Sequence, residues 1–403
     1  MLTRARLVAG PLSWCCRLLL AAGAVCAAFG DSILAGEPSG EGEGASPEVF
    51  RVWTMGCAHV GSDLRRGRES LADAIRQSEF GGDEGGPPFD WDIALHVGDL
   101  SGTQEAPDDD EGREVVRQFA AARKHRREQF YNLVGNHDAS RTGEPTMAWF
   151  RKWVDPTGEN PETSGVDAGR RPFPIEGTWE RYSFRAGNLL FLVMSDRNDL
   201  PPPVGRGPRG GYPAGAVTGE TFDWWKSMVE ANRDAIIITA HHHMLKETTV
   251  RSGPWEGMAK RADGSWRSGV HGYFPEGAPQ GASYLYFVNG KPDAQAFERY
   301  LAEHPGAIDF WIGGHTHTDP DDRTGGRSHL ERKWGVTFLN TAALTRHHGG
   351  KVPMSRRLTF TDGSNQVRVQ CYLHTSEHAP QGWYDQAERT VEIGKPFRVP
   401  WGP

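Results

Sequence analysis

The chain reads Gln-Phe-Tyr-Asn-Leu-Val over residues 129–134 and Gly-Asn-His-Asp over residues 135–138. An apolar run that ends in glycine and three polar residues is typical of a buried strand that stops at a tight turn. Open α/β sheets place their functional sites at the carboxyl ends of such strands. Asn136 offers an amide oxygen for a metal, and His137 offers a titratable nitrogen that Asp138 can hold in place. The stretch therefore predicts a catalytic or metal site at a strand end.

The same arrangement recurs along the chain. Four further motifs each follow an apolar run: residues 57–59 (Cys-Ala-His), 98–102 (Gly-Asp-Leu-Ser-Gly), 241–243 (His-His-His) and 314–317 (Gly-His-Thr-His). Each motif alone has an ordinary explanation, because Gly-Asp is a common turn and paired histidines are often surface residues. Five motifs in this order, each after a predicted strand, favour one shared metal site.

This ordered set resembles the calcineurin-like metallophosphoesterase family, which includes purple acid phosphatases and cyclic nucleotide phosphodiesterases. The family signature reads Asp-x-His, Gly-Asp, Gly-Asn-His-Asp or Glu, a later His, and Gly-His-x-His. The resemblance covers roughly residues 49–345. It implies an α/β fold, a four-layer α/β/β/α sandwich of two mixed sheets flanked by helices. It also implies a cofactor of two divalent or trivalent metal ions: iron, zinc or manganese.

The resemblance also implies how the ligands divide between the two metals. The first metal would take residue 57, His59, Asp99 and His317. The second would take Asp99, Asn136, His242 and His315, so that Asp99 bridges the pair. A water held between two such metals attacks phosphorus in line.

The same resemblance assigns the acid chemistry to the opening stretch. His137 would protonate or stabilise the leaving oxygen, and Asp138 would orient His137. Arg346, His347 and His348 follow the strand after Gly-His-x-His, where Arg346 and His347 are candidates to contact the substrate phosphate. The alternative is that residues 346–348 form a solvated turn.

Two positions depart from the family pattern. In the family the later ligand His stands two residues before a proline. Met244 occupies that place if His242 is the ligand, so we prefer His242, with His241 second and His243 lining the pocket or packing. Cys57 stands where the family has Asp; a thiolate binds zinc or iron, which predicts that Cys57 is a ligand. Otherwise Cys57 is a small core residue that leaves the first metal one ligand short.

Length and composition set the outer limits. The chain has 403 residues, with 14 Trp and 18 Phe, enough to bury a sizeable core in one large or two ordinary domains. The formal net charge of −7 argues against a generally basic, nucleic-acid-binding surface. Gly and Pro are abundant, which indicates long irregular loops, and we expect substrate selection to depend on residues 155–178, 199–215 and 250–282.

The N-terminus resembles a targeting segment. Arg4, Arg6 and Arg17 precede an apolar run over residues 18–28 that is rich in alanine. This pattern predicts a secretory signal over residues 1–30, and hence a protein exported to a periplasm or the extracellular space. The run is too short for a membrane anchor, so no transmembrane segment is expected after removal of the signal. A lipid-modified Cys26 is the alternative anchor. Of the five cysteines, Cys57 and Cys371 lie outside the signal, and pairing them would remove Cys57 from metal chemistry.

The remaining patterns define the expected domain. An acidic, glycine-rich linker over residues 31–48 precedes a domain over residues 49–375, and residues 376–403 form an appended tail. Residues 108–111 are expected to begin a helix that extends to Arg126. Further helices are expected over residues 69–76, 218–231 and 294–303. Strands are expected over residues 49–55, 91–97, 129–134, 188–196, 235–240, 308–312 and 336–340, and a hairpin over 358–373.

The sequence thus predicts an exported, metal-dependent phosphoric ester hydrolase. It would hydrolyse a small phosphate mono- or diester by attack of a metal-bridging hydroxide, as the resemblance implies. A narrower phosphodiesterase for a cyclic nucleotide or lipid headgroup is a variant of this prediction. The alternative, motivated by Cys57, is a metal-binding but catalytically weak family member that acts as a binding protein. Nuclease activity is disfavoured by the acidic balance.

Overall fold

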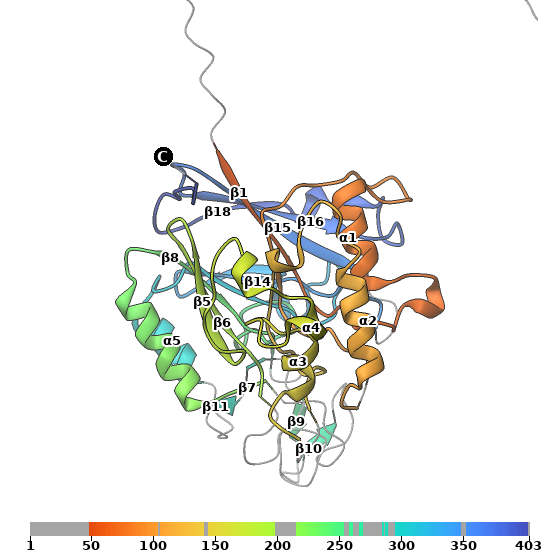
Figure 1. Ribbon diagram of the computed structural model, residues 1–403. Helices are drawn as coiled ribbons and strands as arrows, with labels where there is room; N and C mark the ends of the chain where they lie inside the picture. The colour runs from red at the N-terminus through yellow and green to blue at the C-terminus, as the bar shows by residue number, and fades with distance from the viewer. Residues whose placement is uncertain are drawn as a thin grey trace, which may run out of the picture. The chain divides into compact units, whose positions relative to one another are not determined.

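Two mixed β-sheets form the centre of the domain (Figure 1). The computed structural model describes residues 48–103, 105–140, 144–197, 215–253, 258–260, 266–268, 284–285, 287–288, 295–347 and 352–401. The predicted signal and nearly all of the predicted linker lie outside these residues, as does His348. None of the described helices is long and apolar enough to cross a membrane.

The first sheet contains the N-terminal and C-terminal strands. Its order is β17 (Gly382–Trp383), β16 (Gln366–Leu373), β15 (Met354–Thr361), β1 (Val49–Met55), β2 (Ile93–His96) and β3 (Phe130–Asn132), with β18 (Arg389–Glu392) also beside β16. β1, β2 and β3 run parallel, so their carboxyl ends lie at one edge of the sheet. β15 is antiparallel to both β1 and β16.

The second sheet contains the middle of the chain. Its order is β13 (Leu330–Lys333), β14 (Val336–Asn340), β12 (Phe310–Gly313), β8 (Ile236–Ala240), β6 (Leu189–Met194), β5 (Arg181–Ala186) and β4 (Glu176–Gly177). β6, β8, β12 and β14 are parallel, and the remaining pairs are antiparallel. Two short pairs lie outside both sheets: β7 (Ala216–Val217) with β11 (Phe287–Val288), and β9 (Met258–Lys260) with β10 (Trp266–Ser268).

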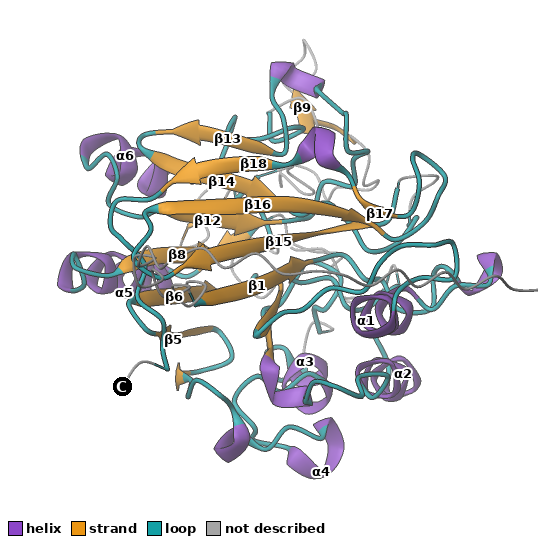
Figure 2. Ribbon diagram, turned by 90° about the horizontal axis from the view of Figure 1, so that it is seen from above, coloured by secondary structure: helices purple, strands orange, loops and turns teal. Residues whose placement is uncertain are grey.

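Helices cover the outer face of each sheet. They are α1 (Ser70–Phe80), α2 (Asp109–Phe119), α3 (Ala148–Trp153), α4 (Pro161–Ser164), α5 (Gly219–Ala231) and α6 (Gln295–Glu303). Short 3-10 turns cover residues Leu64–Arg66, Arg127–Gln129, Ala168–Arg170, Thr324–Gly326 and Asp385–Ala387. Viewed from above, α1 and α2 lie on one side of the strands and α5 and α6 on the other (Figure 2).

Three hydrophobic clusters separate these layers. One cluster lies between the sheets, where Phe50 and Val52 of β1 meet Phe191 of β6. Alternate β1 residues, Trp53 and Met55, face outward and pack in a second cluster with α1, α2 and α3. A third cluster packs α5 and α6 on the outer face of the second sheet. Strands buried on both faces carry near-continuous apolar runs, as β6 and β8 do. The predicted four-layer α/β/β/α sandwich is confirmed.

Helix α2 begins as predicted but ends early. Asp108 caps the helix by accepting a hydrogen bond from the Glu111 amide, which is the usual role of an N-cap aspartate. The helix ends at Phe119 and does not reach Arg126, so that part of the prediction is wrong. The reason is tertiary: the buried Glu79 carboxylate accepts hydrogen bonds from the amides of residues 123–125, which draws the chain out of the helix.

The C-terminal segment is built into the domain. Within residues 376–401, β17 and β18 extend the first sheet and Phe397 joins the cluster between the sheets. Residues 376–403 were predicted to form an appended tail, but the described part of this segment belongs to the sandwich. Residues 155–178 contain α4 and β4 as well as loop. The other two predicted insertions lie largely outside the described residues.

Candidate metal centre

The motif residues meet at the carboxyl ends of parallel strands from both sheets. β1, β2 and β3 lead into residues 57–59, 98–102 and 135–138, while β8 and β12 lead into residues 241–243 and 314–317. β14 leads into residues 341–347. The two sheets therefore bring motifs that are up to 260 residues apart (317 − 57 = 260) to one place. This is the edge at which open α/β sheets place their sites.

Hydrogen bonds connect two of these turns. The Asp138 carboxylate accepts hydrogen bonds from the amides of Asp99, Leu100, Ser101 and Gly135 at 2.8–2.9 Å. In return, Asp99 Oδ1 accepts the His137 amide at 2.8 Å. Asp138 therefore fixes the Gly98-Asp99 turn, and Asp99 fixes the Asn136-His137 turn.

Glycine is required where the two turns touch. A Cβ on Gly98 would lie 2.6 Å from the Gly135 amide nitrogen, and a Cβ on Gly135 would lie 2.3 Å from the Asp99 amide nitrogen. Gly98 also has a φ of +90°, in the region that favours glycine. The close approach of these two backbones places the Asp99 side chain beside the Asn136 side chain.

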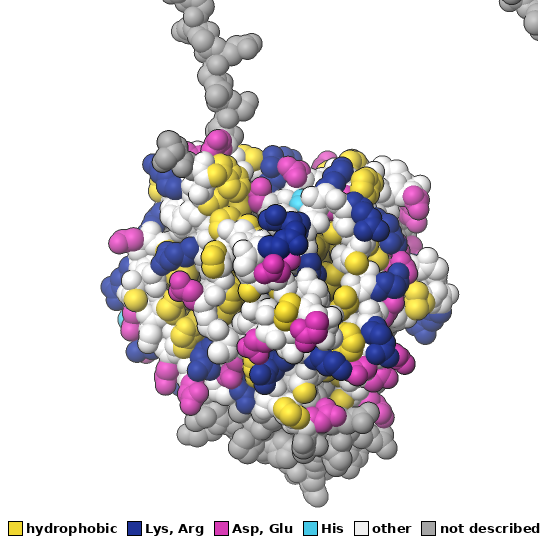
Figure 3. Space-filling model, viewed as in Figure 1, with side chains coloured by type: hydrophobic (Ala, Val, Ile, Leu, Met, Phe, Trp, Pro, Cys, Tyr) yellow, Lys and Arg dark blue, Asp and Glu magenta, His cyan; other side chains and the backbone are white. Residues whose placement is uncertain are grey.

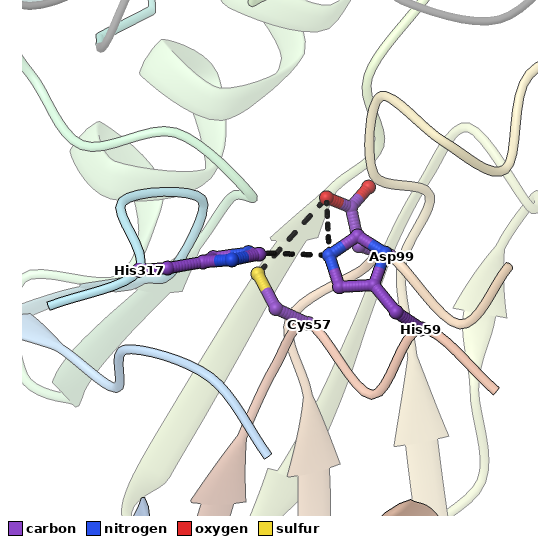
Figure 4. Close-up of side chains that lie close together, drawn as sticks. All are labelled: Cys57, His59, Asp99 and His317. Carbon is purple, nitrogen blue, oxygen red and sulfur yellow. Dashed lines mark hydrogen bonds and ion pairs between the residues drawn. The ribbon is translucent and has the colours of Figure 1, made fainter. Parts of the chain in front are cut away.

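The first donor set consists of the residues predicted for the first metal: Cys57, His59, Asp99 and His317. Their ligand atoms all lie within 4.8 Å of one another. Figure 4 shows the four side chains converging. Cys57 and His59 lie on the turn after β1, Asp99 on the turn after β2, and His317 on the loop after β12. Asp99 Oδ2 lies 4.0 Å from Cys57 Sγ and 3.7 Å from His59 Nε2, and the two Nε2 atoms of His59 and His317 are 3.1 Å apart.

The second donor set consists of Asp99, Asn136, His242 and His315. His242 Nε2 and His315 Nδ1 each lie 2.9 Å from Asn136 Oδ1, and 3.3 Å from each other. His242 Nε2 also lies 3.1 Å from Asp99 Oδ2. The structure thus brings together the residues predicted for the second metal, and it places His242, not His241, in this set.

One oxygen is common to both donor sets. Asp99 Oδ2 faces Cys57 and His59 on one side and His242 on the other, while Oδ1 is held by the His137 amide. Burial alone would raise the pKa of Asp99, but His242, His137 and His59 hold it well below its ordinary value. Asp99 is therefore an ionised carboxylate in position to bridge two cations.

The protonation of the imidazoles favours a cation inside each set. His59 Nδ1 faces the Ser101 carbonyl at 2.9 Å, and His242 Nδ1 faces the Val97 carbonyl at 2.7 Å. A carbonyl only accepts hydrogen bonds, so each ring carries a proton on Nδ1 and directs Nε2 to the centre. Burial lowers the pKa of His59 well below its ordinary value, so its Nε2 presents a lone pair. Burial alone would lower the pKa of His242, but the Asp99 carboxylate raises it to about 9, which shows that a positive charge is favoured between His242 Nε2 and the oxygens of Asp99 and Asn136. A metal ion can take the place of that proton.

The spacing of the first set suits a tetrahedral metal. Zinc bonds of about 2.0–2.3 Å to nitrogen, oxygen and sulfur give ligand–ligand separations of about 3.3–3.6 Å in a tetrahedron. The observed separations of 3.1, 3.7 and 4.0 Å lie around those values. Burial and the Asp99 charge raise the pKa of the Cys57 thiol well above its ordinary value. Metal binding would therefore have to displace the thiol proton.

The backbone is strained where these side chains are presented. Cys57, His59, Asp99 and His315 have φ angles of +51°, +38°, +60° and +66°. Non-glycine residues rarely adopt positive φ, and each such residue costs on the order of 1–3 kcal/mol. Strain of this kind is concentrated at functional sites, where the surrounding structure enforces a required side-chain direction.

His137 lies over the first donor set and is held by the loop at Thr103. Its Nδ1 lies 2.7 Å from the Thr103 carbonyl, and its ring meets the His59 ring edge-on at a centroid distance of 4.6 Å. Both oxygens of Asp138 accept backbone amides. Asp138 thus organises the two turns, and the Thr103 carbonyl holds Nδ1 of His137; the predicted effect of Asp138 on His137 stays a prediction.

The two candidate substrate contacts differ in their surroundings. The His347 ring stacks on His59 at a centroid distance of 4.1 Å, and ligand atoms of His59, His137 and His347 lie within 4.8 Å of one another. The Arg346 guanidinium instead pairs with Asp63 at 3.6 Å and with Glu377 at 2.5 Å. The charge of Arg346 is therefore balanced by protein carboxylates, whereas His347 belongs to the centre.

Sequence reasoning missed two supporting acids. Glu111, in the acidic run at the start of α2, accepts hydrogen bonds from Ser101 Oγ and from the amides of Gly102 and Thr103. This loop supplies the carbonyls that hold His59 and His137. Asp63, which the sequence left unassigned, is buried and ties Arg66, Arg68 and Arg346 together. No local pattern distinguishes either acid from a solvated one.

The two free cysteines are far from forming a pair. Cys57 lies in the centre, while Cys371 is buried in β16 beside Met354. The disulfide considered from the sequence is absent, so Cys57 remains available as a thiol or thiolate.

Comparison with known proteins assigns the class. The model of the calcineurin-like phosphoesterase family matches residues 50–319, which is two thirds of the chain. The chain therefore belongs to the calcineurin-like phosphoesterase family, and the resemblance seen in its motifs is confirmed. Members of this family usually hold two metal ions, and the two donor sets around Asp99 are the candidate positions in this chain. A search of functionally curated proteins gave no match.

Solved structures with a similar fold include GAP50 and Vps29. One is GAP50, the anchor in the inner membrane complex of Plasmodium (8% identity, covering 87% of this chain and 90% of that chain, TM-score 0.44). Others are Vps29 from Chaetomium thermophilum (8% identity, 86% and 100% covered, TM-score 0.31) and a single mutant of Vps29 from Entamoeba histolytica (11% identity, 86% and 100% covered, TM-score 0.30). At these identities the similarity extends to the fold alone.

Proposed function

We propose that the protein is a dinuclear-metal phosphoric ester hydrolase that acts on a small phosphate mono- or diester. The observation that carries this proposal is the Asp99 carboxylate, which is shared by two complete donor sets beside His137. Two bound metal ions supply a Lewis-acid clamp on the ester and acidify the attacking water. The donor atoms, which include a thiol and imidazoles, favour iron or zinc, while manganese is less favoured by sulfur.

Two histidines beside the donor sets would contact the substrate. His137 lies over the first donor set, where it would donate a proton or hydrogen bond to the leaving oxygen. His347, stacked on His59, would contact an oxygen of the phosphoryl group. We do not retain Arg346 in that role, because Asp63 and Glu377 already balance its charge. The formal net charge of −7 supports a small substrate over a nucleic acid, and basic and acidic side chains are interspersed on the face shown in Figure 3.

A second candidate function is metal binding without efficient turnover. Cys57 favours it, because a buried thiol with a raised pKa replaces the carboxylate of the family signature. In that case the first position would bind a metal weakly or not at all, and the protein would act as a binding partner. His137 argues against this candidate, because a binding site has no need of an acid over the metal position.

One set of samples separates the two candidates. We would measure metal content by elemental analysis and hydrolysis of an aryl phosphate monoester and diester for the wild type, Cys57→Ser and His137→Ala. If the protein is a hydrolase, we expect about two metals per chain in the wild type. We expect one metal and lost turnover in Cys57→Ser, and both metals with lost turnover in His137→Ala. A wild type with one metal or none, and no turnover with zinc, iron or manganese, would establish the binding protein instead.

Export is a separate proposal that rests on the N-terminal sequence. Arg4, Arg6 and Arg17 followed by the apolar run over residues 18–28 support a cleaved secretory signal, with a lipid on Cys26 as the alternative. Intact-mass measurement of the protein recovered from a secreting host tests it. A mature N-terminus near residue 28 or 35 is expected, and an uncleaved chain retained in the cytosol would contradict it.

A further inference from the structure

A buried Asp–His pair adjoins the second donor set. Asp196 follows β6, and its Oδ2 lies 3.0 Å from Nδ1 of His243, which follows β8. Asp196 Oδ1 accepts the Ala216 amide at 2.7 Å, and His241 Nε2 lies 3.5 Å from it. Asp196, His241 and His243 are all fully buried. The carboxylate thus fixes the ring of His243 without contact with solvent.

The same histidine lies against the second metal position. Its ring packs on His315 at a centroid distance of 4.0 Å and meets His242 edge-on at 5.0 Å. One ligand atom from each of His242, His243 and His315 lies within 4.8 Å of the others. Three imidazoles from two different strand ends therefore surround this position.

The second ring nitrogen of His243 has no hydrogen-bond partner in the part of the chain that the structure describes. His243 Nδ1 faces the Asp196 carboxylate at 3.0 Å as a close ion-pair contact, which favours the ring proton on Nδ1 and leaves Nε2 with the lone pair. His243 Nε2 is buried and has no hydrogen-bond partner among the described residues. A buried polar atom without a partner costs about 1–3 kcal/mol. A carboxylate that holds one ring nitrogen while the other binds a cation is the usual arrangement of a metal-binding histidine.

We propose that His243, held by Asp196, is a third imidazole ligand of the second metal position. This inference rests on the proposed dinuclear centre. The second set becomes three nitrogens from His242, His243 and His315 with the oxygens of Asp99 and Asn136. Imidazole-rich sets suit zinc, iron or cobalt, whereas magnesium and calcium prefer oxygen. The Asp196–His243 pair would therefore select a borderline metal at this position.

Cobalt binding to the metal-depleted full chain tests the proposal without an activity assay. Co²⁺ is titrated into the wild type, His243→Gln, Asp196→Asn and His374→Gln, and its visible absorption reports the ligands while a competing chelator gives the affinity. His374→Gln is the matched control, because His374 is also a buried, hydrogen-bonded histidine but lies outside both donor sets. Near-ultraviolet circular dichroism checks that each variant is folded.

The expected result is specific to one of the two binding steps. The wild type and His374→Gln should bind two Co²⁺ per chain with the same spectrum. His243→Gln and Asp196→Asn should each weaken one step by about 10–100-fold and alter its absorption bands. If His243→Gln binds both ions with wild-type affinity and spectrum, the proposal is overturned; should it fail to fold, unchanged binding in Asp196→Asn overturns it. A wild type that binds fewer than two Co²⁺ would overturn the dinuclear centre itself, which is a different result.

Discussion

Replacing Asp138 by asparagine tests how the centre is held together. The two carboxylate oxygens accept four backbone amides, two on each oxygen: Asp99 and Gly135 on Oδ2, and Leu100 and Ser101 on Oδ1. Asparagine has one accepting oxygen and one amino group. Whichever way its amide is oriented, two buried N–H groups would face another N–H donor.

The cost follows from those two amides. Each buried donor without a partner costs about 1–3 kcal/mol, so the pair costs about 2–6 kcal/mol. Part of this loss is offset, because burial and the nearby Asp99 charge raise the pKa of Asp138 to about 7, and a neutral amide removes that repulsion. We expect a net loss of about 2–4 kcal/mol in the free energy of unfolding, which lowers Tm by roughly 3–5 °C in a domain of about 350 residues. Because Asp99 moves with its turn, both metals should bind more weakly.

Two matched variants make the test sharp. Asp155 is likewise buried and accepts the amides of Glu159 and Asn160 and the Ser164 hydroxyl, away from the metal centre. Asp155→Asn should lower Tm while leaving metal content unchanged, and His137→Ala should keep both Tm and metal while losing turnover. Thermal unfolding and elemental analysis of the three variants suffice. If Asp138→Asn instead matches His137→Ala, retaining stability and both metals, then Asp138 acts through His137 and our account of the two turns is wrong.

Three further predictions concern single acids and the thiol. Glu111→Ala should lower kcat by about 10–100-fold at unchanged metal content, because the loop that orients His59 and His137 loses its anchor. Glu111→Gln keeps one accepting oxygen and should recover part of the rate. Equal losses of kcat in the two variants would refute this role of Glu111. Cys57→Asp should lower the ratio of zinc to manganese affinity by at least about tenfold, measured by chelator competition, and an unchanged ratio would mean that Cys57 does not bind the metal. Burial alone would raise the pKa of Glu79, but the amides of residues 123–125 hold that pKa below its ordinary value. The stability that Glu79 contributes is therefore present above its unfolded-state pKa and is lost as pH falls through its folded-state pKa. Glu79→Gln should flatten that acid-side loss in unfolding experiments from pH 7 to 3, and an unchanged profile would contradict the assignment.

The strands and the positions of the donor residues were predictable because they depend on local patterns. Buried parallel strands appear as apolar runs, and the residue after each run is presented at the carboxyl edge of the sheet. The predicted strand over residues 49–55 and that over residues 336–340 agree with β1 and β14 to the residue. This reasoning places Asp99 and the histidine triplet at the site, and the family resemblance then selects His242 within the triplet.

The supporting contacts were not predictable because they depend on which turns meet. Asp138 follows His137 in sequence, which suggested a side-chain pair, yet its carboxylate is saturated by amides from a turn about 40 residues earlier. Glu111 has the local setting of an ordinary acid in the first turn of a helix. Only the packing of α2 against residues 101–103 gives it a role in the centre.

The two departures from an oxygen-rich centre act in the same direction. Cys57 replaces a carboxylate with sulfur at the first position, and His243 would add a nitrogen at the second. Each change makes its donor set softer, and softer donors favour zinc or iron over magnesium, manganese or calcium. If Cys57 were only a small core residue, the first position would not favour a soft metal. The extra imidazole of His243, held by Asp196, would then have no counterpart at the first position. A joint loss of selectivity in Cys57→Asp combined with His243→Gln, greater than in either variant alone, would show that the chain has tuned both positions for the same kind of metal.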